Sequence, residues 1–152
     1  MSTLRSLLFA AGLGLLALAA CHEQTTQATQ EAAPAATGPQ CYAHTSATDT
    51  IRLTLQTTQP TVTGQLTYHY YEKDRNQGTI SGTMHGDTLL ADYTFQSEGT
   101  TSVRQVAFLR RDIGFIEGFG PVVERQGKTV FEKPQALAFD AKYTLLPVAC
   151  PR

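Results

Sequence analysis

The sequence predicts an all-β domain, and two observations carry this prediction. First, apolar and polar residues alternate with a period of two past Cys41, as around Ile51, Leu53 and Leu55, which is typical of half-buried strands. Second, turn-forming residues recur about every ten to twelve positions, a spacing typical of a barrel or a sandwich. We therefore expect an antiparallel meander that closes into a small up-and-down β-barrel, with a β-sandwich as the alternative.

About eight to nine strands are expected along the chain. They cover residues 51–55, 62–70, 79–84, 88–96, 102–109, 115–124, 129–132, 136–139 and 143–149. Tight turns such as Gln59-Pro60 and Glu98-Gly99 separate them. Because each strand is expected to pair with its neighbour in the chain, the arrangement would be broadly lipocalin-like. Closure of such a meander removes its exposed edges and brings the first strand beside the last.

The N-terminus has the pattern of a secretory signal. Arg5 is the only early charge, an apolar run extends from Leu7 to Leu18, and small residues follow it. The run ends in Leu18-Ala19-Ala20-Cys21, which resembles the lipobox of bacterial lipoproteins. This resemblance implies a signal peptide over residues 1–20 and a mature chain that begins at an acylated Cys21, anchored to a membrane by several acyl chains. The alternative is an ordinary signal peptide with a chance cysteine.

The segment after Cys21 is expected to be a tether. Residues 22–40 contain no Leu, Ile, Val or aromatic residue, so they cannot bury enough surface to offset the entropy of ordering. We therefore expect a lipidated cysteine and disordered tether over residues 21–39, followed by a single β domain over residues 40–152.

The two remaining cysteines predict a disulfide bond. Cys41 and Cys150 stand at the first and last positions of the expected domain, and an exported protein meets oxidising conditions. The pair lacks the Cys-x-x-Cys spacing of a redox site. A bond between them would join the first strand of the barrel to the last one.

Composition and motifs argue against several functions. The 12 basic and 13 acidic residues form no run of either sign, whereas nucleic acids need a basic face. Four histidines are present: His22, His44, His69 and His85. They lack metal-ligand spacing, so we expect neither a metal nor a cofactor. Ser97 and Ser102 have no neighbouring base, and we therefore expect a protein without enzymatic activity.

Arg104 is the strongest candidate for a binding residue. If Glu98-Gly99 is the centre of a two-residue turn, Tyr93 lies directly opposite Arg104 in the hairpin. Arg104 then shares the apolar face of its strand with Phe108 and points into the domain. A shift of the turn by one residue would reverse this orientation.

An inward arginine needs a carboxylate or several acceptors, because an unpaired buried charge is strongly unfavourable. The candidate partners are Glu117 and Glu72. One interpretation is an interior that binds an anion or a carboxylate. Its residues would be Arg104 as the anchor, with Tyr93, Glu117, Tyr68 and Tyr70. The other interpretation is a structural ion pair at a barrel end, with the tyrosines serving as core packing.

Several sequence segments resemble those of a group of small, uncharacterised lipoproteins of the Bacteroidota envelope type. They include "VTGQLTYHYYEKD", "NQGTISGTMHGDTLLADYTF", "SEGTTSVRQVAF" and "EGFG". The resemblance implies a lipoprotein of the bacterial cell envelope, and it implies no activity. We expect the anchor to lie in the outer membrane, with the face that it occupies left open. Three functions stay open: a module that binds a small ligand or an envelope protein, a structural or interaction lipoprotein with a filled interior, and an envelope hydrolase.

Overall fold

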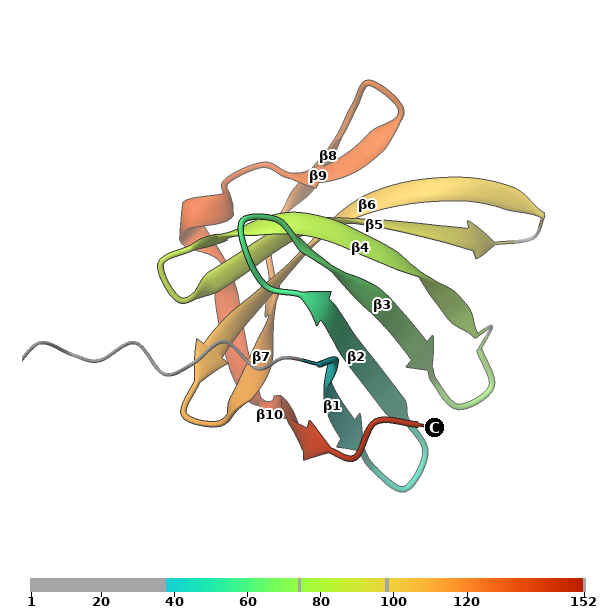
Figure 1. Ribbon diagram of the computed structural model, residues 1–152. Coiled ribbons are helices and arrows are strands. Elements are labelled where there is room, and N and C mark those ends of the chain that lie inside the picture. Colours follow the sequence, from blue (N-terminus) through green and yellow to red (C-terminus); the bar gives the residue numbers. More distant parts are fainter. Residues whose placement is uncertain (1–37, 74, 98, 152) are drawn as a thin grey trace, which may run out of the picture. The chain divides into compact units, whose positions relative to one another are not determined.

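The computed structural model describes residues 38–73, 75–97 and 99–151 (Figure 1). The expected signal peptide, Cys21 and the tether up to residue 37 lie outside the described residues. The strands are β1 (Gln40–Thr45), β2 (Thr50–Thr57), β3 (Val62–His69), β4 (Asn76–His85), β5 (Thr88–Ser97), β6 (Thr100–Arg111), β7 (Gly114–Phe119), β8 (Val122–Arg125), β9 (Lys128–Phe131) and β10 (Ala138–Val148). One short 3₁₀ helix, η1 (Pro134–Ala136), precedes β10. Among the described residues, no helix has the length and apolar character needed to cross a membrane.

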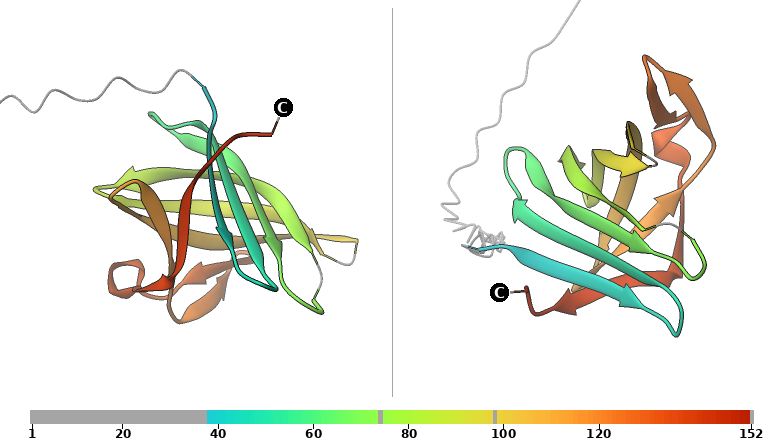
Figure 2. Two further views of the ribbon diagram at one scale, coloured as in Figure 1. Left: turned by 90° about the horizontal axis from the view of Figure 1, so that it is seen from below. Right: turned by 90° about the vertical axis from the view of Figure 1, so that its right-hand side faces the viewer.

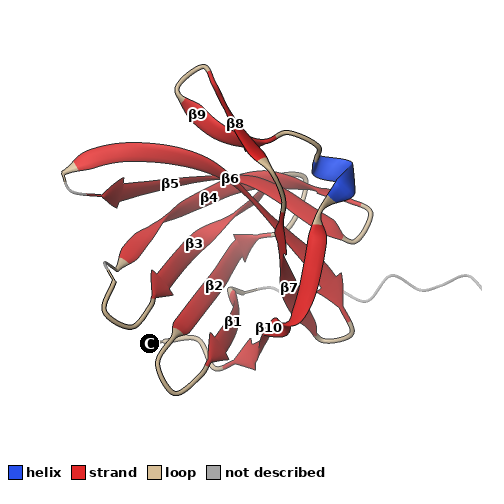
Figure 3. Cartoon of the chain, turned by 180° about the vertical axis from the view of Figure 1, so that it is seen from behind, coloured by secondary structure: helices blue, strands red, loops and turns tan. Residues whose placement is uncertain are grey.

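Eight of the strands close into an antiparallel barrel. The hydrogen-bonded order runs from β1 through β7, then to β10, and β10 returns to β1 (Figure 3). The prediction of a small all-β barrel is therefore confirmed. The remaining two strands form the hairpin β8–β9, which leaves the ring and touches β6 through a parallel bridge between Arg104 and Thr129. This hairpin stands apart from the barrel in two orthogonal views (Figures 1 and 2).

The strand boundaries differ from the prediction in three places. Strand β1 was not expected, because Gln40–Thr45 shows no clear alternation of apolar and polar residues. The expected strand 115–124 is two strands, β7 and β8, because Pro121 has no N–H to offer a ladder and follows the flexible Gly120. The two short strands expected at 136–139 and 143–149 are one strand, β10, with a register shift between Phe139 and Thr144.

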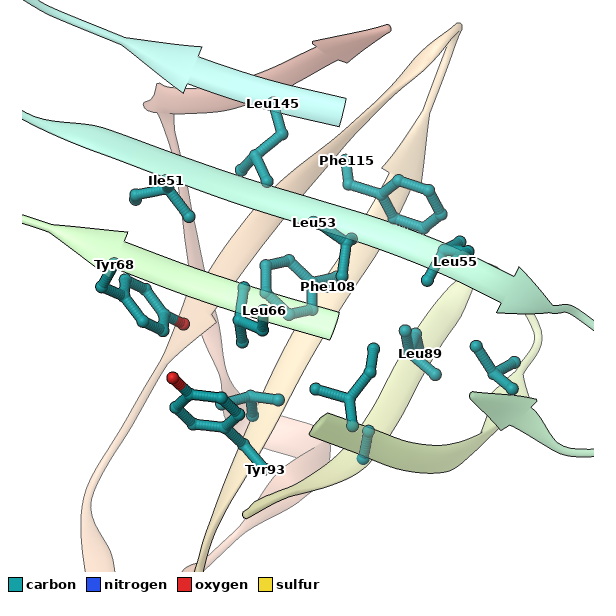
Figure 4. Close-up of a cluster of buried hydrophobic side chains, with 14 residues drawn as sticks. Ile51, Leu53, Leu55, Leu66, Tyr68, Leu89, Tyr93, Phe108, Phe115 and Leu145 are labelled. Atoms are coloured by element: carbon teal, nitrogen blue, oxygen red, sulfur yellow. The ribbon is translucent and has the colours of Figure 1, made fainter. Parts of the chain in front are cut away.

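Side chains on the inner faces fill most of the barrel. The buried core consists of Ile51, Leu53, Leu55, Val62, Leu66, Tyr68, Ile80, Leu89, Ala91, Tyr93, Val106, Phe108, Phe115 and Leu145 (Figure 4). Phe108 is completely buried, and burial of one such side chain contributes about 1.5–3 kcal/mol. The middle of the barrel is thus a packed core, and a cavity inside the barrel can lie only at one of the barrel's ends.

The disulfide bond between Cys41 and Cys150 is confirmed. Their Cα atoms lie 5.2 Å apart, within the usual range for a disulfide. Strands β1 and β10 pair side by side, with Cys41 opposite Val148, so the bond links β1 to the residues just after β10, at the point where the ring closes.

Candidate functional site

The hairpin β5–β6 places Arg104 on the inner face of the barrel. The predicted register is confirmed, with Ser97 opposite Thr100 and Tyr93 opposite Arg104. Gly99 has a φ of +77°, a conformation that glycine adopts without strain, in the turn between the two strands. Because the turn has two residues, Arg104 shares the inward face with Tyr93, which is fully buried.

Three aromatic rings surround the guanidinium group of Arg104. Its Cζ lies 4.9 Å from the ring centre of Tyr68, 5.5 Å from that of Tyr93 and 5.6 Å from that of Phe95. Such contacts attract a cation, each by about 0.5–2 kcal/mol, with the larger values away from water. Tyr70 extends the group, because its ring stacks on Tyr68 at 5.8 Å. The aromatic cluster therefore holds the positive charge in place without neutralising it.

Glu117 is the carboxylate that faces this cluster. It lies in β7 with 4% of its surface exposed, and the Tyr68 hydroxyl donates a hydrogen bond of 2.5 Å to its Oε1. Glu72, the other candidate partner, is exposed in the turn after β3. The described residues contain no ion pair between Arg104 and either carboxylate. The expected partner Glu117 thus points inward but bonds to a tyrosine.

Burial raises the pKa of Glu117 to about 7, although the hydrogen bond from Tyr68 and the charge of Arg104 act in the opposite direction. Burial also raises the pKa of Tyr93 and of Tyr70 to about 12, and it raises the pKa of Tyr68 well above its ordinary value. All three phenols therefore keep their protons near neutral pH, whereas Glu117 can gain or lose one there.

A cavity of about 260 Å³ opens at this end of the barrel, and we call it the mouth. It is lined by Tyr70, Asn76, Arg104, Gln105, Val106, Glu117, Gly118, Phe119, Gly120, Val122, Thr129 and Phe131. The hairpin β8–β9 supplies three of these residues and so forms one wall. No local pattern in the sequence indicates this wall or Asn76, whereas the alternation of Phe95 with Tyr93 is a signal that places Phe95 in the aromatic cluster.

Three buried polar atoms of the cluster have no hydrogen-bond partner within the described chain: Tyr93 Oη, Arg104 Nε and Glu117 Oε2. An unsatisfied buried group costs about 1–3 kcal/mol, and native proteins contain few of them. In Figure 4, the hydroxyl groups of Tyr68 and Tyr93 point toward one another inside the barrel. Two of these atoms belong to Arg104 and Glu117, which line the mouth, and polar groups that converge on a cavity are typical of a binding site.

A larger cavity of about 410 Å³ lies on the outside of the barrel. His85, Leu90, Pro134 and Phe139 are among its lining residues, and none of the unpartnered atoms belongs to it. The mouth is the stronger candidate because size alone does not recognise a ligand, whereas convergent polar groups do.

The other predicted features stay separate from the mouth. The described residues contain no group of three or more His, Cys, Asp or Glu side chains that could hold a metal ion. His44 packs against Tyr143 at 5.6 Å, and His85 lies beside Thr83 on β4.

Comparison with protein families, with curated proteins and with solved structures found no match. The fold and the cavity therefore define a closed β-barrel with a candidate ligand site at one end.

Proposed function

We propose that this chain is a lipid-anchored lipoprotein of the bacterial cell envelope whose barrel binds a small ligand in the mouth without chemically converting it. One observation carries this proposal. Buried polar atoms of Arg104 and Glu117 lack partners, and both residues line the same cavity. With a volume of about 260 Å³, the cavity suits a ligand smaller than a typical drug.

The two other functions receive less support. A structural protein would have a filled interior, and the middle of the barrel is filled by the packed core. The mouth differs from this expectation, because it is a cavity lined by a cation and a carboxyl group. A hydrolase needs a nucleophile beside a base or a pair of acidic groups. Glu117 is the only Asp, Glu, His or Cys in the lining of the mouth, and it has no such partner there.

The chain enters the barrel away from the mouth. Gln40, the first residue of β1, lies opposite Leu55 of β2. Tyr68 of the aromatic cluster lies opposite Ile51, at the other end of β2. At about 3.3 Å per residue, Ile51 and Leu55 are roughly 13 Å apart along the strand. Gln40 and the mouth therefore lie at opposite ends of the barrel strands, which suits a binding role for a domain anchored through its N-terminal side.

Replacing Cys21, the cysteine that would be acylated, should release the protein from membranes. Cys21→Ser removes the thiol on which acylation would occur, so we expect the variant to move from the membrane pellet to the soluble fraction after cell fractionation. The matched control is the Cys150→Ser variant, which leaves the proposed lipid acceptor intact and should stay in the pellet. Unchanged partitioning of Cys21→Ser would contradict the lipid anchor and would leave ligand binding untouched.

Ligand binding can be tested with a panel of small probes. The panel contains 3-phenylpropionate, cyclohexanecarboxylate and hexanoate, each with its amide and its amine analogue. We expect at least one probe to shift the NMR amide signals of Gly118 and Gly120, which line the mouth, and to leave Gly86 unchanged. The protein is the full chain in a non-ionic detergent, labelled with ¹⁵N-glycine.

The matched variants are Arg104→Gln and Arg110→Gln. Both arginines lie over an aromatic ring, but Arg110 is exposed and sits over Phe115, 5.7 Å from its centre. Arg104→Gln should weaken binding of a carboxylate by about tenfold or more, the usual value of a charged hydrogen bond, and Arg110→Gln should not. A panel in which no probe shifts either glycine signal would overturn the proposed function.

A further inference from the structure

The three unpartnered atoms of the cluster, two of which belong to residues that line the mouth, can all donate hydrogen bonds if Glu117 is protonated. Arg104 Nε carries a hydrogen and can only donate, and the Tyr93 hydroxyl is free to donate. Glu117 Oε2 can donate only if the carboxyl group is protonated, because Oε1 already accepts from Tyr68. With that proton in place, both Arg104 and Glu117, which line the mouth, carry an unpaired donor, and this suits a ligand that only accepts.

The charges around Glu117 also make anion binding depend on the protonation of this residue. The titratable groups that face it are Tyr68 from β3, Tyr70 just after β3, Tyr93 from β5 and Arg104 from β6. Tyr143 of β10 and Asp49, in the turn before β2, act in turn on Tyr70. Within the lining itself, Arg104 is the only cation and Glu117 the only acid.

Protonation of Glu117 therefore decides the net charge of the mouth. A neutral Glu117 leaves the charge of Arg104 uncompensated, and the lining then attracts an anion. An ionised Glu117 cancels that charge and would stand beside a bound anion in a place shielded from water, where like charges repel strongly. Phe119 and Val122 add apolar surface to the lining, and they expose 47% and 52% of their surfaces.

We propose that the mouth binds a small carboxylate with an apolar body together with one proton, which Glu117 carries, and releases both as the pH rises. This proposal rests on the proposed function and adds the class of ligand and its control. Arg104 pairs with the carboxylate, the protonated Glu117 donates to it, and the rim contacts the apolar body.

The pKa of about 7 for Glu117 sets the pH at which release begins. A bound carboxylate raises this pKa further, because the neutral form of Glu117 then becomes still more favourable. By linkage, the affinity is constant below about pH 7 and falls by about tenfold for each pH unit above it, until the pKa of the complex is reached.

The test is a binding titration of the full chain with 3-phenylpropionate at a series of pH values between about 5.5 and 8.5. The probe is ionised throughout this range, since ordinary carboxylic acids titrate near pH 4 to 5. The dissociation constant comes from the Gly118 and Gly120 signals. We expect it to rise about tenfold per pH unit above about 7, and we expect the neutral amide analogue to bind independently of pH.

Glu117→Gln is the matched variant. Glutamine keeps an oxygen that can accept from Tyr68 and places an amide donor where Oε2 lies. It should bind 3-phenylpropionate with the same affinity at every pH of the series. As an independent measurement on the unaltered protein, the ¹³C signal of the Glu117 carboxyl group should titrate at a higher pH with the probe bound than without it.

The outcomes separate this proposal from the proposed function. Binding of 3-phenylpropionate whose affinity changes less than about twofold over the series, or pH dependence that persists in Glu117→Gln, would overturn the proton coupling and leave the ligand site standing. If the amide or amine probes bind at the mouth and no carboxylate does, the class of ligand is wrong. If no probe of the panel binds, both proposals fall.

Discussion

Replacing Cys41 and Cys150 together by serine should lower the free energy of unfolding by about 2 to 5 kcal/mol. The two cysteines are 109 residues apart in the sequence, so the bond restricts nearly the whole domain in the unfolded state. The pairing of β1 with β10, which the bond reinforces, is short. Strands β1 and β10 share three register positions, and one of them holds Pro147, which has no N–H to donate.

The measurement is urea unfolding of the double variant and of the unaltered protein, with and without a reducing agent. Serine suits position 41, because the Thr54 hydroxyl lies 3.5 Å from Cys41 Sγ and can pair with a hydroxyl group there. The reductant should destabilise the unaltered protein by a similar amount and leave the double variant unchanged. Equal unfolding midpoints for the oxidised protein and the double variant would contradict a stabilising role for the bond.

The second large effect is a change in stability with pH that depends on Glu117. In the folded protein, burial raises the pKa of Glu117 from its ordinary value of 4.5 to about 7, a change worth about 3 kcal/mol. The folded state therefore holds the proton more tightly than the unfolded state. The resulting stability is fully present below pH 4.5 and is lost as the pH rises through about 7.

Glu117→Gln should remove this loss. The variant should match the unaltered protein at about pH 4.5 and exceed it by about 3 kcal/mol at about pH 9, because glutamine stays neutral and can still accept from Tyr68. The control is Glu124→Gln, since Glu124 also accepts from a hydroxyl group, that of Thr129, but is exposed. Its effect should stay within about 0.5 kcal/mol at either pH. If the difference in free energy of unfolding between Glu117→Gln and the unaltered protein does not change with pH, the burial of a titrating carboxyl group is refuted.

Local rules were enough to predict much of the barrel and one side of the mouth. The alternation of residues marks the strands, and a two-residue turn at Glu98-Gly99 implies that Tyr93 faces Arg104. Glu117 follows Phe115 by two positions in β7, the spacing of one strand face, and both residues are buried. These predictions succeed because pairing across a tight hairpin and the choice of face depend on residues that are close in sequence.

Contacts between distant segments could not be predicted in this way. The sequence shows the glycine and proline at 120–121, but it does not show that the next two strands leave the ring and return to β6 at Thr129. That return supplies one wall of the mouth. The choice between a carboxylate paired with Arg104 and one bonded to Tyr68 also depends on how β3, β6 and β7 meet inside the barrel.

Residue types and their order thus specify an all-β domain, the disulfide between the two ends of this domain, and the inward arginine. The closed barrel adds what no local pattern contains: a buried Glu117 that bonds to Tyr68 across 49 positions of sequence, beside an arginine held by three aromatic rings. Removal of water from that carboxyl group raises its pKa, and burial is a property of the packed structure, to which strands from the whole chain contribute.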